Sequence, residues 1–233
     1  MKMQDKKAKE AEKRKQHKEQ LKATRRQEPI LERVLPTLLE KPTFLIVCEG
    51  KNTEPSYFKQ FRLSTATIKI VGLGFNTTSL VKRAIQLYKE KQYDQVWCVF
   101  DYDGFKNFNN AIITAEANQF GVAYSNQAFE YWLILHLDDH QGGGMNRTDY
   151  NKKINELLKP YNLNYDGEKS KVITEEIFEV LYGIDEKTKK ERIQLAIERA
   201  KRNFKHHGDK DSPALCESST TVFKLVEELL KYK

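Results

Sequence analysis

Two short apolar segments of this chain end on acidic residues, and this pattern is typical of a metal site. Residues 44–48 lead directly into Glu49. Residues 96–100 lead into Asp101 and, two positions later, Asp103. Apolar runs that stop so abruptly are typical of buried strands, and neighbouring parallel strands would bring the three carboxylates to one sheet edge. Because these charges repel one another without a cation between them, the pattern predicts bound Mg²⁺ or Mn²⁺ and chemistry on phosphate groups.

The loop after the first acidic strand end carries further candidate site residues. Gly50 permits a tight turn beside a ligand, Thr53 is a suitable N-cap, and Pro55 suits the first turn of a helix. Amide groups at such a helix start can hold a phosphate, and Lys51 is a candidate contact to nucleic acid. Glu54 is either a second catalytic acid or a first-turn charge that the helix dipole favours.

A later helix adds one acid and one histidine to the candidates. Residues 127–137 form a strongly apolar helix pattern that follows a short strand. We expect Glu130, near the start of this helix, to face the acidic cluster as a catalytic residue; the other interpretation places it on the solvent side. His136 is a candidate base, although a histidine on an apolar helix is more often a hydrogen-bonded core residue.

The elements that must position these residues alternate between strand and helix. Strand patterns occur at residues 44–49, 67–71, 95–101 and 122–124. Helix patterns occur at residues 54–63, 77–90, 108–118 and 127–137. The alternation predicts an α/β fold with a Rossmann-like, mostly parallel sheet flanked by helices. Sites in such sheets lie at the carboxyl ends of the strands, which is where the acids fall.

The chain beyond residue 140 has only helical patterns. They cover residues 148–158, 173–182, 185–204 and 219–232. Lys201, Arg202 and Lys205 form a basic patch near the end of the third pattern. The patch is either a nucleic-acid contact or a solvated helix end.

Charge is unevenly distributed along the chain. Residues 1–30 carry 11 Lys or Arg and 5 Asp or Glu, so they hold six of the seven net positive charges. Such an arm is either a solvated charged helix or a sequence-independent contact to phosphate backbones. We therefore predict a basic helical N-terminal arm at residues 1–41, an α/β domain at residues 42–140, and a mainly helical C-terminal region at residues 141–233.

Composition argues against several classes of protein. The 233 residues suffice for one α/β core with an added region. No apolar stretch is as long as a membrane span, and none follows the basic N-terminus as in a signal peptide, so we expect a cytoplasmic protein with no membrane partner. The cysteines form no C-x-x-C pair, which argues against zinc, and no P-loop motif is present. The oligomeric state does not follow from the sequence.

Three segments resemble a known family. Glu-Gly after one strand and Asp-x-Asp after a later one resemble the Toprim domain of topoisomerases, primases and several nucleases. Residues 47–58, 99–103 and 125–136 more specifically resemble the RloB family, which is also the AbiLii-like group of phage-defence proteins. The resemblance covers roughly residues 42–140 and extends to residues 218–222, which resemble the family's C-terminal segment. One departure is Gln127, because proline is common at this position in the family.

The resemblance has implications for the site and its partners. Toprim nucleases hold Mg²⁺ with the Asp-x-Asp carboxylates, so Asp101 and Asp103 would be metal ligands and Glu49 the catalytic acid/base. The resemblance also implies an RloA-like ATPase partner and a toxin-like role in bacterial phage defence. Two functions stay open: an Mg²⁺-dependent nuclease acting on DNA or RNA, tRNA included, and a non-catalytic Toprim-like scaffold or sensor that binds the ATPase partner or nucleic acid.

Overall fold

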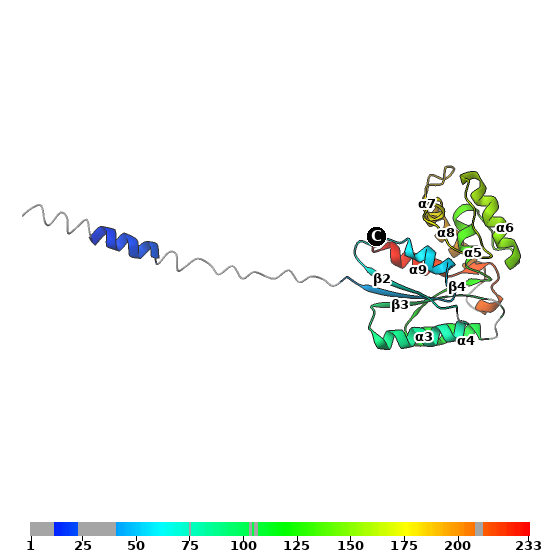
Figure 1. Ribbon diagram of the computed structural model, residues 1–233, viewed down its shortest axis with the longest axis horizontal. Coiled ribbons are helices and arrows are strands. Elements are labelled where there is room, and N and C mark those ends of the chain that lie inside the picture. Colours follow the sequence, from blue (N-terminus) through cyan, green and yellow to red (C-terminus); the bar gives the residue numbers. More distant parts are fainter. Residues whose placement is uncertain (1–11, 23–40, 75, 103, 105–106, 208–211) are drawn as a thin grey trace, which may run out of the picture. The chain divides into compact units, whose positions relative to one another are not determined.

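The computed structural model describes residues 12–22, 41–74, 76–102, 104, 107–207 and 212–233 (Figure 1). The chain divides into two compact units, residues 1–40 and residues 41–233. In the first unit, residues 12–22 are helical and exposed, and the rest of the predicted basic arm before residue 41 lies outside the described residues. The boundary predicted at residues 140 and 141 stays a prediction, since both sides belong to the second unit.

A five-stranded sheet forms the centre of the second unit, in the order β2-β1-β3-β4-β5. The strands are β1 (Thr43–Cys48), β2 (Thr67–Gly72), β3 (Gln95–Asp101), β4 (Gly121–Asn126) and β5 (Ser219–Thr220). The first four strands are parallel, and β5 pairs antiparallel with β4. The predicted α/β fold with a mostly parallel sheet flanked by helices is therefore confirmed.

Helices cover both faces of the sheet (Figure 1). They are α2 (Thr53–Lys59), α3 (Thr77–Glu90), α4 (Phe108–Ala117), α5 (Glu130–Leu137), α6 (Arg147–Leu158), α7 (Glu175–Tyr182), α8 (Arg192–His206) and α9 (Val222–Leu230). Helices α3 and α4 pack on one face, and the remaining helices gather on the other. Among the described residues, no helix has the length and apolar character needed to cross a membrane.

Strand β1 is apolar at every position from Phe44 to Val47 because both of its faces are covered by helices. Phe44 and Ile46 belong to the core under α2, α5 and α9, whereas Leu45 and Val47 belong to the core under α3 and α4. All four side chains are completely buried. Alternate side chains of a strand point to opposite faces, so a strand covered on both faces needs apolar residues at every position.

Strand β5 replaces the first residues of the helix predicted to begin at residue 219. Thr220 pairs with β4, and its Oγ1 donates to the carbonyl of Tyr124 at 2.9 Å. Thr221 Oγ1 accepts a hydrogen bond from the Tyr124 amide at 2.9 Å. These buried hydroxyls engage the backbone of β4, and side chains of this kind favour non-helical conformations. The helix therefore begins at Val222.

Helix α8 begins at Arg192, seven residues after the predicted start at Asp185. The Asp185 carboxylate accepts hydrogen bonds from the amide of Thr188 at 2.7 Å and from its hydroxyl at 2.8 Å. A single antiparallel bridge then joins Ile184 to Glu191. The aspartate side chain thus stabilises a turn in place of the first helical turns.

Candidate functional site

The two acidic strand ends lie next to each other. Strands β1 and β3 are parallel neighbours in which Cys48 pairs with Val99. The Glu49 amide donates to the Val99 carbonyl at 2.9 Å and continues this ladder by one residue. The Asp101 amide in turn donates to the Glu49 carboxylate, to Oε2, at 3.2 Å. The structure therefore brings Glu49 and Asp101 together at the carboxyl edge of the sheet, where the sequence placed them.

Helix α3 provides a second donor to Glu49. Thr77, the first residue of the helix, is buried, and its hydroxyl lies 3.4 Å from Glu49 Oε1. One carboxylate oxygen thus faces the end of β3 and the other faces the start of α3. Two donors from different elements therefore hold the carboxylate at the strand end.

Glu54 is a buried acid in the first turn of α2. Its side chain is 4% exposed, and Oε1 accepts a hydrogen bond from the Gly50 amide at 3.1 Å. A side chain at position 50 would collide with this carboxylate, so only glycine lets the two approach so closely. The loop and the helix start therefore aim a second carboxylate at the strand edge.

Glu130, the first residue of α5, receives a hydrogen bond from a distant tyrosine. The Tyr165 hydroxyl lies 3.0 Å from Glu130 Oε1 and 3.0 Å from Thr53 Oγ1. Burial, and then the neighbouring Glu130 carboxylate, raise the pKa of Tyr165 well above its ordinary value. The phenol therefore keeps its proton and donates to the carboxylate.

The four acidic residues described above line one pocket of about 340 Å³. Its charged side chains are Glu49, Glu54, Asp101, Glu130, Lys51 and Lys171. All except Lys171 are sequence-predicted site residues, and these five come from three parts of the chain: residues 49–54, the end of β3 and the start of α5. Four carboxylates and two ammonium groups give the pocket a formal charge of about −2, which favours a divalent cation over an anion.

The chemistry of this donor set suits Mg²⁺ or Mn²⁺, because all four acidic ligand candidates offer hard oxygen atoms. Among the described residues, however, no group of three or more histidine, cysteine, aspartate or glutamate side chains is arranged closely enough to hold a metal ion. The predicted third ligand, Asp103, lies outside the described residues. The described residues therefore include two predicted ligands, Glu49 and Asp101, joined by a hydrogen bond.

His136 lies in the core and is not among the residues that line the pocket. It is 1% exposed; its Nδ1 lies 2.7 Å from the Leu181 carbonyl, and its Nε2 lies 3.2 Å from the Tyr57 hydroxyl. Because a carbonyl only accepts, Nδ1 carries the proton and Nε2 accepts from Tyr57. Burial lowers the pKa of His136 to about 3, so the ring is neutral. The structure therefore places His136, the predicted base, in the packed core as a hydrogen-bonded residue outside the pocket.

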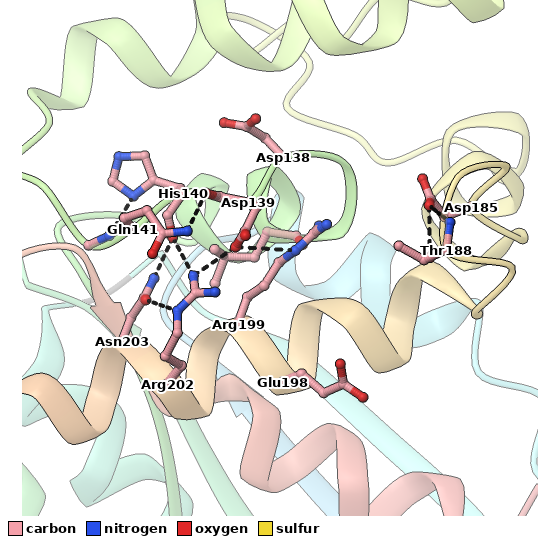
Figure 2. A network of polar contacts seen from close by, with 12 residues as sticks. Asp138, Asp139, His140, Gln141, Asp185, Thr188, Glu198, Arg199, Arg202 and Asn203 are labelled. Atoms are coloured by element: carbon pink, nitrogen blue, oxygen red, sulfur yellow. Dashed lines mark hydrogen bonds and ion pairs between the residues drawn. The ribbon is translucent and has the colours of Figure 1, made fainter.

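The predicted basic patch on α8 also lies apart from the pocket. Lys201 forms an ion pair with Glu227 at 2.5 Å. Arg202 contacts Asp139 at 2.8 Å and donates to the His140 carbonyl at 3.1 Å, within the network of Figure 2. The guanidinium lowers the pKa of the Asp139 carboxyl. Two of the three basic residues of this patch therefore bind acidic residues of the chain itself, and the third, Lys205, is exposed.

Sequence reasoning missed Lys171, which reaches the pocket from the loop between α6 and α7. Asp166 closes this turn: its carbonyl accepts from the Lys171 amide at 2.8 Å, and its carboxylate accepts from the amides of Lys169 and Ser170. Asn52 then ties the loop to the start of α2 through the Ser170 carbonyl, at 2.9 Å. No local signal marks a lysine that arrives by such long-range packing.

Comparison with protein-family models matches residues 44–229 to the family described as RloB-like protein. The match includes the carboxylate pocket and every strand and helix from β1 to α9, except the first residue of β1 and the last residue of α9. Comparison with curated proteins and with solved structures gives no match. On this evidence the chain belongs to the RloB-like protein family.

Proposed function

We propose that this RloB-like protein is a metal-dependent nuclease that hydrolyses phosphodiester bonds in DNA or RNA. The observation that carries the proposal is the pocket in which Glu49, Glu54, Asp101 and Glu130 converge at the carboxyl edge of a parallel sheet. Ligand sites of open α/β sheets lie at this edge. Carboxylate clusters of this kind serve hydrolysis because they combine cation binding with proton transfer.

Glu49, Asp101 and Asp103 are the residues that would hold Mg²⁺ or Mn²⁺. When bound, such an ion neutralises charge on the phosphate and lowers the pKa of an attacking water. Glu49 is preoriented for this task by two donors, the Asp101 amide and the Thr77 hydroxyl. Its carboxylate therefore needs little reorganisation when a ligand arrives.

The other charged residues of the pocket have complementary tasks. Glu54 and Glu130 are the candidate proton donors and acceptors, and the Gly50 amide and the Tyr165 hydroxyl orient them. Lys51 and Lys171 are the candidate phosphate contacts. Their two positive charges offset part of the carboxylate charge, so that an anionic substrate can approach once the cation is bound.

The biological role that we propose is that of a toxin-like effector in bacterial phage defence, controlled by an RloA-like ATPase partner. This part rests on family membership and on the resemblance of the three sequence segments. The charged groups of the pocket would contact phosphate groups and a metal ion, and such contacts do not depend on base sequence. A nuclease that cuts without sequence preference would suit that role. Structured RNA such as tRNA is one candidate substrate.

The proposal is tested with Asp101→Asn in an assay with Mg²⁺ and both DNA and RNA substrates. We expect at least a ~100-fold loss of cleavage with an unchanged melting temperature, since charge at a metal site is removed while the shape is kept. Asp149→Asn removes the same charge from an exposed position in the first turn of α6 and should cleave normally. Equal activity of the Asp101 variant and the wild type would discard the mechanism.

A second function is favoured by one observation: the described residues contain no ready group of three metal ligands. In that case the protein is a non-catalytic scaffold that binds the ATPase partner or nucleic acid. The scaffold hypothesis predicts that a calorimetric titration of the full chain with Mg²⁺ or Mn²⁺ gives no heat of binding. Saturable binding that Asp103→Asn weakens would reject the scaffold.

A further inference from the structure

A second pocket of about 360 Å³ adjoins the carboxylate pocket. The two pockets share Lys51 and Asn52 as lining residues, so they meet at the start of α2. The second pocket continues along α2 to Lys59 and is closed on its other side by residues 172–174. We call it the flanking pocket. Its position makes it the continuation of the candidate site along the surface.

The wall of the flanking pocket is fastened to α2. The Ile173 amide donates to Ser56 Oγ at 2.8 Å, and Ser56 Oγ in turn donates to the Thr53 carbonyl at 2.9 Å. Asn52 donates to the Ser170 carbonyl at 2.9 Å where the two pockets meet. The bonds from Ile173 and from Asn52 each join segments more than a hundred residues apart, so the pocket is preformed and need not be assembled by its ligand.

The charges of the two pockets are opposite. Among the residues that the structure describes, the flanking pocket is lined by Lys51 and Lys59 and by no acidic residue, whereas four carboxylates line its neighbour. Within the described residues, neither ammonium group has a hydrogen bond or an ion pair. Glu175, an acid just beyond the pocket wall, is already paired with Arg62 at 2.9 Å. The flanking pocket therefore attracts anions without any cation being bound.

We propose that the flanking pocket binds the phosphate next to the one that is cleaved, with Lys59 as its principal contact and Lys51 at the junction. The substrate is then a single polynucleotide strand that crosses from one pocket to the other. This inference rests on the proposed function. The two pockets then have different roles. The flanking pocket supplies salt-dependent affinity for the strand, and the carboxylate pocket hydrolyses the phosphodiester bond.

The test compares Lys59→Gln with Lys69→Gln, which removes the same charge from an exposed lysine of β2 that lines neither pocket. Each variant is assayed with a 12-residue oligonucleotide and with bis(p-nitrophenyl) phosphate, a diester too short to reach both pockets. We expect Lys59→Gln to lower kcat/KM for the oligonucleotide more than for the small diester, through KM. Lys69→Gln should lower neither. Equal losses on the two substrates would overturn the inference.

Binding without cleavage gives a separate readout. Fluorescence anisotropy of the labelled oligonucleotide, in EDTA and at several salt concentrations, should show weaker binding to Lys59→Gln. The slope of log K against log salt is negative, and its magnitude should fall by about 0.7, the value for one lost phosphate contact on a single strand. If the wild type cleaves neither substrate, the proposed nuclease function fails, and the binding comparison still decides the flanking pocket. Identical binding curves for Lys59→Gln and the wild type would overturn it.

Discussion

The Asp101 amide donates a hydrogen bond to the Glu49 carboxylate at 3.2 Å and so ties the end of β3 to the end of β1. The bond joins residues 52 positions apart in the chain. It also aligns the Glu49 side chain along the sheet edge, because the backbone amide cannot move independently of the strand. The relative position of the first two acidic residues is therefore set by strand pairing.

Glu49→Gln should weaken metal binding and leave the fold intact. The amide oxygen of glutamine can still accept from the Asp101 backbone, but the negative charge is lost. Loss of one carboxylate charge beside a divalent cation should reduce its affinity by about tenfold or more. Calorimetric titration with Mn²⁺ and thermal unfolding measure the two effects. Glu116→Gln, an exposed change on α4, is the control, and titration curves that coincide with the wild type would contradict the prediction.

Lys171→Gln should raise KM for a phosphodiester substrate without lowering stability. Lys171 lines the carboxylate pocket from a backbone position with φ of 50°, whereas Lys169 of the same turn is exposed and lies outside the pocket. Lys169→Gln therefore matches the change in net charge. Steady-state kinetics of both variants, with urea unfolding, separate a local contact from a general charge effect. A similar rise in KM for both would remove Lys171 from the site.

His136 should make the protein less stable as the pH falls below neutrality. Burial lowers its pKa from 6.5 to about 3, so the unfolded chain binds a proton before the folded one. The stabilisation is complete above pH 6.5 and is lost as the pH falls toward 3, by up to about 1.4 kcal/mol per pH unit.

The measurement is urea unfolding of the wild type and His136→Asn between pH 7.5 and pH 5. Asparagine can donate to the Leu181 carbonyl in place of Nδ1 but does not titrate. We expect a shallower dependence of unfolding free energy on pH in the variant, and an unchanged pH profile of cleavage. His140, whose pKa is also lowered by burial, is present in both proteins. Parallel pH dependences would show that His136 does not titrate as described.

Thr221→Val should destabilise the fold by about 1–3 kcal/mol, because it leaves the buried Tyr124 amide without its acceptor. The Thr221 hydroxyl also donates to the Val122 carbonyl at 3.2 Å. Thr221→Ser keeps the hydroxyl and serves as the matched control. Unfolding free energies in urea measure the difference between the two variants. Equal stability would mean that the hydroxyl is dispensable.

The sequence allowed the acidic strand ends to be predicted because the signal is local. Residues 44–48 are apolar at every position and Glu49 follows directly, so the burial of the strand and the place of the acid can be read together. The strand containing Asp101 has the same form. Parallel pairing then requires the two ends to lie on one edge, and the register confirms that they do.

Other parts of the site could not be predicted, because they depend on tertiary contacts. Tyr165 reaches Thr53 across 112 residues and Glu130 across 35. Tyr165 lies in the loop before α7, and nothing in the neighbouring sequence distinguishes it from any other tyrosine in a loop between helices. Strand β5 was missed for a related reason: Ser219 and Thr220 are too few to form a strand pattern, and their backbone pairing is visible only beside β4.

Strand β5 also has a consequence for incomplete chains. Residues 219 and 220 provide the last neighbour of β4, so a polypeptide that ends before them leaves an open row of amides and carbonyls along that strand. Such a fragment is prone to pair with another molecule and aggregate. During synthesis, the sheet can be completed only after residue 220 has left the ribosome, more than ninety residues after the end of β4.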